Sequence, residues 1–158
     1  MAVLAINKKA SFDYEFLETY DAGIVLFGHE VKSVRSGQVN LKGAYISFKP
    51  DESRKIAAYL VNCHISLYKF AGKMDAYQPE RDRKILLKKK ELDHLFSKKQ
   101  EKGLTVIPVK LYTKGSFIKL ELAVGRGKKK YDKRDDLKKK DEDRRIKTLL
   151  KSKLKISL

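Results

Sequence analysis

Three histidines and a single cysteine are the residues of this chain whose types most readily support catalysis or metal binding. His29, His64 and His94 form no HxH or HExxH spacing, and no Gly-x-Ser-x-Gly nucleophile motif accompanies them. Cys63 has no second cysteine to pair with, so the sequence excludes an intramolecular disulfide and a thiolate metal cluster. We therefore expect a protein that is not an enzyme and holds no metal and no cofactor.

Two other patterns resemble parts of enzymes. Residues 125–129 contain glycines followed by lysines, but the GxxxxGK[ST] phosphate loop is not matched, because the glycine spacing is wrong and no Ser or Thr follows the lysine. Asp13, Glu15 and Glu18 are candidate metal ligands of an RNA-modifying or RNA-cleaving enzyme. Strand alternation would place Asp13 and Glu15 on one face, and solvated outward carboxylates explain this more simply.

Positive charge dominates the composition. The chain has 37 Lys and Arg against 20 Asp and Glu, a formal net charge of +17, so an anionic partner is expected. No apolar run approaches the roughly 18 residues of a membrane-spanning helix, and the apolar start at residues 1–6 is too short for a secretory signal. We expect a cytoplasmic protein whose partner is not a membrane.

The cations that most suggest RNA binding are Arg81, Arg83 and Lys84. They lie at the end of a loop expected at about residues 67–82, which holds three aromatic side chains. Guanidinium groups contact phosphates, and rings beside them stack on unpaired bases. Glu30 would repel phosphate, so it either accepts hydrogen bonds from ribose hydroxyls or base amines, or forms an ion pair with a nearby cation.

Hydrophobic periodicity predicts the elements that position these residues. The alternation of Phe12, Tyr14 and Phe16 indicates a strand that reaches about residue 26. Further strands are expected at 44–48, 56–62, 104–112 and 117–124, and helices at 29–36, stopped by Gly37, and around 92–96. The predicted fold class is mainly β: a small closed antiparallel barrel of about five to six strands with two or three flanking short helices.

The composition changes after residue 124, so two domains are expected: an RNA-binding β-barrel domain at 1–124 and a basic C-terminal tail at 125–158. The tail carries 15 Lys and Arg against 6 Asp and Glu, and it has too few aromatic residues to order itself alone. Helix formers dominate residues 135–155, and the apolar residues there fall on one narrow stripe: Ile146, Leu149, Leu150 and Leu154. We expect the tail to be disordered when free and helical against a polyanion.

Five blocks of sequence resemble the signatures of the bacterial SsrA-binding protein (SmpB) family. They are Asn7–Ala10, Glu18–Leu26, Gly28–Gly37, Arg83–Leu87 and Gly127–Arg134, and they cover nearly the whole chain in the family's order. The resemblance implies an OB-fold-like barrel with flanking helices, which agrees with the meander of strands predicted from periodicity. It also implies a partner, the transfer-messenger RNA, bound through its tRNA-like domain.

The resemblance and the basic cluster together define the expected contact residues. The residues expected to bind RNA are Asn7, Glu30, Lys32, Arg35, Arg81, Arg83, Lys84, Lys128 and Lys129. The residues expected to contact the ribosomal decoding centre and message channel are Tyr131, Asp132, Lys133, Arg134, Lys138, Lys139, Arg144, Arg145 and Lys147. Tyr131 occupies a position where the family carries a ring suited to stacking on a base.

In that family the complex enters a ribosome stalled on a message without a stop codon, and the stalled chain receives a degradation tag. The resemblance implies that this chain delivers the RNA in trans-translation, while its tail becomes helical on small-subunit RNA and senses the empty message channel. Elongation factor Tu is a further implied partner, by way of the aminoacylated RNA. The alternative is a ribosomal or ribosome-assembly protein that binds ribosomal RNA through the same barrel and tail.

Overall fold

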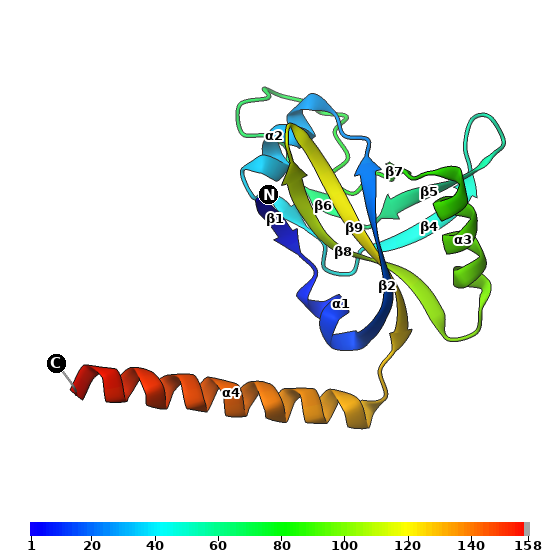
Figure 1. Cartoon of the computed structure of the whole chain (residues 1–158). Helices are drawn as coiled ribbons and strands as arrows, with labels where there is room; N and C mark the ends of the chain where they lie inside the picture. Colours follow the sequence, from blue (N-terminus) through cyan, green and yellow to red (C-terminus); the bar gives the residue numbers. More distant parts are fainter. Residues whose placement is uncertain (157–158) are drawn as a thin grey trace. The chain divides into compact units, whose positions relative to one another are not determined.

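The structure is a computed structural model that describes residues 1–156, with side chains described as far as residue 153 (Figure 1). Ser157, Leu158 and the side chain of Leu154, which belong to the predicted tail, lie outside the described residues. The chain divides into two compact units, Met1–Gly127 and Lys128–Leu158, which we call the body and the tail. The division falls after Gly127 rather than Val124, because the last strand of the body continues to Gly127.

A seven-stranded antiparallel sheet forms most of the body, with the order β1-β8-β9-β2-β7-β5-β4 (Figure 1). Its strands are β1 (Val3–Ile6), β2 (Tyr14–Ile24), β4 (Tyr45–Pro50), β5 (Ile56–Val61), β7 (Arg83–Leu86), β8 (Leu104–Lys114) and β9 (Phe117–Gly127). A two-stranded sheet pairs β3 (Val39–Asn40) with β6 (His64–Ile65). The prediction of a mainly β, antiparallel fold is confirmed.

The predicted closure of the sheet into a barrel is not found. β1 and β4 are the two edges of the sheet, and no strand pairing joins them within residues 1–156. The helix Lys8–Asp13 and a pocket lie beside the β4 edge instead. Lys9 and Ala10 of this helix line one wall of the pocket, and Ala44 and Tyr45 line the opposite wall. The observed fold is therefore an open, bent sheet of seven strands (Figure 1), and the expected strand count of five to six is too low.

Four helices accompany the strands in residues 1–156: α1 (Lys8–Asp13), α2 (Gly28–Arg35), α3 (Lys89–Gln100) and α4 (Lys130–Ile156). The predicted helix near 29–36 is confirmed, and Gly37 follows it at φ 78°, a left-handed conformation that glycine adopts without strain. The expectation that Phe12 begins a strand is wrong, because Phe12 lies in α1 and the strand begins at Tyr14. The prediction that residues 125–158 are disordered when free stays a prediction.

The core of the body joins the strands to α2 and α3. Val34 from α2 and Leu95 from α3 are buried in the same apolar cluster as Leu60, Leu111 and Leu122 from β5, β8 and β9. Burying a side chain of this size stabilises the fold by about 1.5–3 kcal/mol. Both helices are therefore held by packing, and α2 presents its first turn in a fixed place.

Candidate nucleic-acid interface

The most buried charged cluster of the body joins Glu30 on α2 to two arginines. Nε and Nη2 of Arg83 donate to Glu30 Oε1 at 3.0 and 2.8 Å. Arg81 donates from Nε to Oε1 at 2.9 Å and from Nη2 to Oε2 at 2.5 Å. The side chains of Glu30 and Arg83 are 0% exposed, while that of Arg81 is 21% exposed. We call these three residues the Glu30 clamp.

Local structure places the clamp. Glu30 lies in the first turn of α2, where its Oε2 also accepts the Phe27 backbone N–H at 2.9 Å, and a carboxylate is favoured at this positive end of the helix. Arg83 begins β7, and its Nη1 and Nη2 donate to the carbonyls of Cys63 and Pro79 at 2.8 and 2.9 Å. The clamp thus fastens α2, β7 and the end of the preceding loop to one another.

The clamp also sets the charge state of its carboxylate. Burial alone would raise the pKa of Glu30, but the hydrogen bonds from Arg81, from the Phe27 backbone N–H and from Arg83, with the charge of Arg83, outweigh it and lower that pKa below the ordinary value of 4.5. Glu30 is therefore ionised at neutral pH. Burial likewise raises the pKa of the neighbouring Cys63 thiol to about 11, so this cysteine is a structural thiol.

Glu30 and Arg83 lie inside the body rather than on its surface. Both were expected to touch RNA, and both side chains are inaccessible to a partner. The ion-pair interpretation of Glu30 is the one that the structure supports. Arg81 is the most exposed of the three clamp residues, and Glu30 holds its guanidinium group in place.

Asn7 likewise has a structural position. Its side-chain Nδ2 donates to the Pro108 carbonyl at 3.0 Å, and its Oδ1 accepts the Ala10 N–H at 3.1 Å, which caps α1. Asn7 is 4% exposed, so direct RNA contact by this side chain is not supported. Asn7 instead fixes α1 against β8.

The other predicted RNA-binding residues of the body lie on the surface but not in one place. Lys32 lies with its Nζ 5.5 Å from the centre of the Tyr68 ring, and Arg35 donates to the Ser116 carbonyl at 2.8 Å. Lys84 is paired with Asp51 at 2.9 Å and its side chain is 41% exposed. These cations remain available to phosphate, each already oriented by a neighbour.

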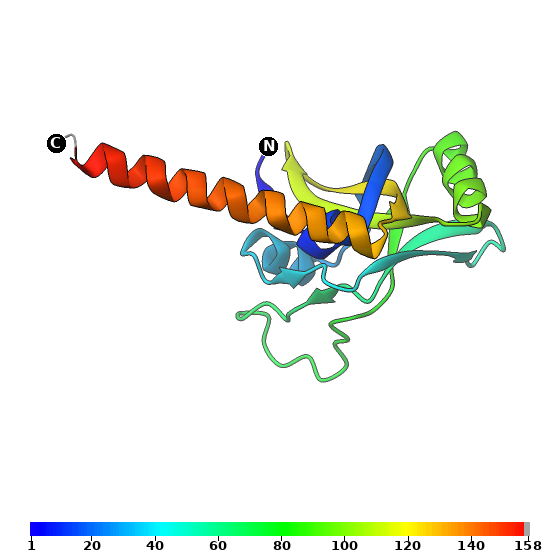
Figure 2. The ribbon, with the colours of Figure 1, turned by 90° about the horizontal axis from the view of Figure 1, so that it is seen from below.

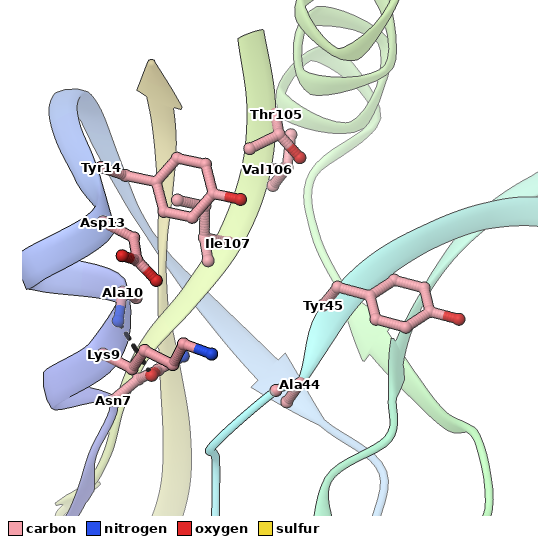
Figure 3. Close-up of a pocket in the computed structure, with 11 residues that line it drawn as sticks. Asn7, Lys9, Ala10, Asp13, Tyr14, Ala44, Tyr45, Thr105, Val106 and Ile107 are labelled. Atoms are coloured by element: carbon pink, nitrogen blue, oxygen red, sulfur yellow. Dashed lines mark hydrogen bonds between the residues drawn. The ribbon is translucent and has the colours of Figure 1, made fainter. Parts of the chain in front are cut away.

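A pocket of about 200 Å³ lies where α1 meets the starts of β4 and β8 (Figure 3). Tyr14 and Tyr45 line it, together with Lys9 and Asp13 of α1, and Lys9 extends into the space between α1 and β4. A cation beside two phenol rings can bind a phosphate and a base together. The sequence did not single out Tyr45. Strand alternation was the available signal, because it places Tyr45 on the opposite face from its neighbour Ile46, which is buried.

A second group of missed residues surrounds Arg81. Phe27, His29 and Tyr77 form a cluster of rings beside its guanidinium group. The aromatic content of the loop was noticed in the sequence, but Phe27 and His29 come from the start of α2, far from the loop in the chain. Only the fold brings these rings together.

Of the carboxylates considered for a metal-dependent enzyme, Glu18 has side-chain partners within the body. Glu18 Oε2 accepts from the Tyr20 hydroxyl at 2.7 Å and lies 2.9 Å from Nε2 of His94. Within the part of the chain that the structure describes, no three His, Cys, Asp or Glu residues are grouped to hold a metal ion. In the same described residues, no helix has the length and apolar character needed to cross a membrane.

The tail carries the second set of predicted residues. Tyr131, Asp132, Lys133, Arg134, Lys138, Lys139, Arg144, Arg145 and Lys147 lie on α4, and Lys128 and Lys129 precede it. Lys128 Nζ pairs with Asp136 at 2.5 Å, and that ammonium group lowers the pKa of the Asp136 carboxyl. Tyr131 is 73% exposed. As far as Lys153, the tail therefore offers a row of cations and the accessible ring of Tyr131, and none of its side chains is buried.

A basic body built on a bent antiparallel sheet, joined to a cationic helix, defines a nucleic-acid-binding protein. The family model described as "SmpB protein" matches residues 4–152. The chain therefore belongs to the SmpB family. The resemblance inferred from the five sequence blocks is confirmed.

Three relatives with curated names are similar in sequence to this chain over most of their length. An "SsrA-binding protein" of Sulfurihydrogenibium sp. is 47% identical over 154 residues, which are 98% of this chain and 97% of the relative. One of Nostoc punctiforme is 45% identical over 150 residues, 95% and 94% of the two chains. One of Oleidesulfovibrio alaskensis is 50% identical over 143 residues, 90% and 88% of the two chains.

A solved structure is also similar. It is described as "tmRNA-SmpB: a journey to the center of the bacterial ribosome", and it is 42% identical to this chain with a TM-score of 0.64. The match covers 82% of this chain and 87% of the other. The similarity therefore extends to the fold as well as the sequence.

Proposed function

We propose that this protein binds the tRNA-like domain of transfer-messenger RNA and delivers it to stalled ribosomes in trans-translation, in the cytoplasm. The observation that carries the proposal is the match to SsrA-binding proteins over 90% or more of this chain. The similar solved structure, whose description names both tmRNA and the bacterial ribosome, adds support. Elongation factor Tu takes part by way of the aminoacylated RNA.

In this proposal the body recognises the folded RNA through a surface that is fixed before binding. The Glu30 clamp and Asn7 hold α2, β7 and α1 in place, and Lys32, Arg35, Arg81 and Lys84 make the phosphate contacts. A surface prepared in this way loses little conformational entropy on binding.

The tail acts on the ribosome. Its exposed cations on α4 bind the RNA walls of the message channel, and Tyr131 stacks on a base of the decoding centre. A cationic segment can occupy such a channel only when no message fills it. The tail therefore senses that the message channel is empty.

The test separates the two roles by deleting Asp135–Leu158. The truncated protein should bind transfer-messenger RNA with nearly unchanged affinity and lose tagging on stalled ribosomes. A large loss of affinity in solution would instead make the tail ordinary RNA-binding surface. A protein that prefers isolated ribosomal RNA fragments to transfer-messenger RNA would support the ribosomal alternative.

Salt dependence gives an independent measurement. If the complex neutralises about eight phosphates, the slope of log K against log salt should be roughly −6 to −7, and removing Lys128 should reduce it by about one. A slope near about −1 would contradict an extended basic interface.

A further inference from the structure

A pocket of about 330 Å³ lies between the first turn of α2 and the loop that joins β6 to β7. This loop extends away from the sheet, as the view from below shows (Figure 2). Phe27, His29, Met74, Tyr77 and Arg81 line the pocket, which we call the ring pocket. Its size is at the lower end of the range for small-molecule sites, about 300–1,000 Å³, which suits one planar group rather than a large ligand.

The walls of the ring pocket are aromatic and already arranged. The His29 ring lies 5.7 Å from the Phe27 ring, tilted by 31°, and 5.0 Å from the Tyr77 ring in an edge-on contact at 83°. The Arg81 guanidinium carbon lies 4.0 Å from the centre of the Phe27 ring. Phe27 is 52% exposed, so a large part of this ring remains available to a partner.

Hydrogen bonds hold these walls in place without any ligand. The Tyr77 hydroxyl donates to the Ile65 carbonyl at 2.7 Å, which ties the loop to β6. Arg81 is held in two places by Glu30. Both sides of the pocket are therefore ordered before binding, so a ligand loses little binding free energy to ordering them.

The polar groups of the ring pocket favour a heterocycle. Nε2 of His29 is buried and has no hydrogen-bond partner among the residues that the structure describes, and such a nitrogen can donate or accept. Asp75 also lines the pocket. Its carboxylate repels a phosphate but accepts a hydrogen bond from a base amino group, so the pocket interior suits a base and not the backbone.

Cations and a further exposed ring lie on the nearby loop and helix. Lys32 lies over the Tyr68 ring, and Lys69 lies over the Phe70 ring at 5.8 Å. Phe70 is 78% exposed, and it contacts Tyr68 in an edge-on arrangement. Alternating rings and cations can bind a single-stranded nucleic acid along its length, because its bases stack on the rings and its phosphates contact the cations.

We propose that the ring pocket holds one unstacked nucleobase of a single-stranded segment of the bound RNA, with the base against Phe27 and its edge toward His29 and Asp75. The proposal rests on the proposed function, because it specifies how the body holds its RNA. It assigns recognition to Phe27, His29 and Tyr77 in addition to the basic residues.

The test compares Phe27→Ala with Phe117→Ala in the full-length protein, using transfer-messenger RNA as the probe. Phe117 is the matched control, because it is 72% exposed and lies at the start of β9. Loss of one stacked base should weaken the binding of Phe27→Ala by about 5- to 150-fold. Phe117→Ala should bind within about twofold of the unchanged protein, well below the effect of a lost stack.

Salt dependence distinguishes stacking from charge. Since Phe27→Ala removes no cation, the slope of log K against log salt should stay the same while the affinity falls. Phe27→Leu keeps an apolar side chain of similar size without the ring, so it should fold normally and still bind weakly. Weak binding by Phe27→Ala together with full affinity for Phe27→Leu would overturn the proposal, because packing and not stacking would then be responsible.

The remaining outcomes separate this proposal from the proposed function. If the unchanged protein does not bind transfer-messenger RNA, the proposed function fails. If it binds and Phe27→Ala binds equally well, only the ring-pocket proposal fails. Equal RNA binding with impaired tagging would also overturn it, and would make the ring pocket a contact for a protein of the ribosome.

Discussion

The body and the tail differ in how far their charged side chains are buried and paired. In the body, Glu30 and Arg83 are fully buried and paired, and several surface cations have a specific partner. In the tail, every side chain from Leu137 to Lys153 is exposed. In the proposed function, recognition by the body therefore depends on geometry, while recognition by the tail depends on charge density.

Among the substitutions that test this difference between body and tail, Glu30→Gln is expected to change stability most. Removing one partner of a buried ion pair leaves Arg81 and Arg83 without their carboxylate, which should lower the free energy of unfolding by about 3–5 kcal/mol. Urea denaturation measures the change. The control is Glu142→Gln in the exposed part of α4, which should leave the stability of the body unchanged. Equal effects of the two substitutions would remove the distinction between body and tail.

Acid should remove part of the same interaction. The pKa of Glu30 is lowered below its ordinary 4.5 in the folded protein, so below that pH the unfolded chain binds more protons than the folded one. The stability from the clamp is fully present above pH 4.5 and is lost as the pH falls through the lowered pKa.

Unfolding of the unchanged protein and of Glu30→Gln should therefore be compared at about pH 6, above this loss, and at about pH 3, below the ordinary pKa of 4.5, where the loss has begun. The difference in stability between the two proteins should narrow in acid, because the protonated carboxyl resembles the amide. A difference that stays constant between the two pH values would show that the charge of Glu30 does not stabilise the fold.

A smaller loss is expected from Gly125→Ala in β9. A Cβ at this position would lie 2.7 Å from Cδ1 of Ile107 and 3.2 Å from Cβ of Tyr14, so the neighbours must move. Overpacking of this kind typically costs about 1–3 kcal/mol. Gly127→Ala is the matched control, because a Cβ there meets nothing within 4 Å. A melting temperature equally lowered by both variants would contradict the close packing of β9.

The smallest effect is expected at the surface pair of Lys84 and Asp51. With side chains 41% and 17% exposed, this pair should contribute no more than about 1 kcal/mol to stability. Lys84→Met should therefore change urea denaturation little, yet reduce the salt slope of RNA binding by about one. An unchanged slope would remove Lys84 from the proposed interface.

Local patterns in the sequence were enough to predict much of the fold. The turn residues from Pro50 to Ser53 correctly predicted the hairpin of β4 and β5, and Val31, Val34 and Gly37 correctly predicted α2. Helix α1 was missed, because the alternation from Phe12 onward resembles a strand. The observation that decides in favour of the helix is the Asn7 side chain, which caps it while bonding a carbonyl 101 residues away.

The candidate site was less predictable, because its contacts are distant in the chain. Glu30 and Arg83 are 53 residues apart, and a charged residue in a basic sequence is ordinarily assigned to the surface. Burial of this pair depends on where β7 joins the sheet, which local periodicity does not specify. The ring pocket was missed for the same reason, since Phe27 and Tyr77 meet only after the loop has folded back on α2.

The pairing of β1 with β8 has a consequence for how the chain folds as it is synthesised. The Ala2 N–H donates to the Thr113 hydroxyl, across 111 residues of sequence. The hairpins β4–β5 and β8–β9 can form soon after they emerge, but the first strand has no partner until nearly the whole body has left the exit tunnel. Contacts of such long sequence separation form slowly, so the nascent body completes its sheet late. β1 is synthesised first, yet it is among the last strands to pair.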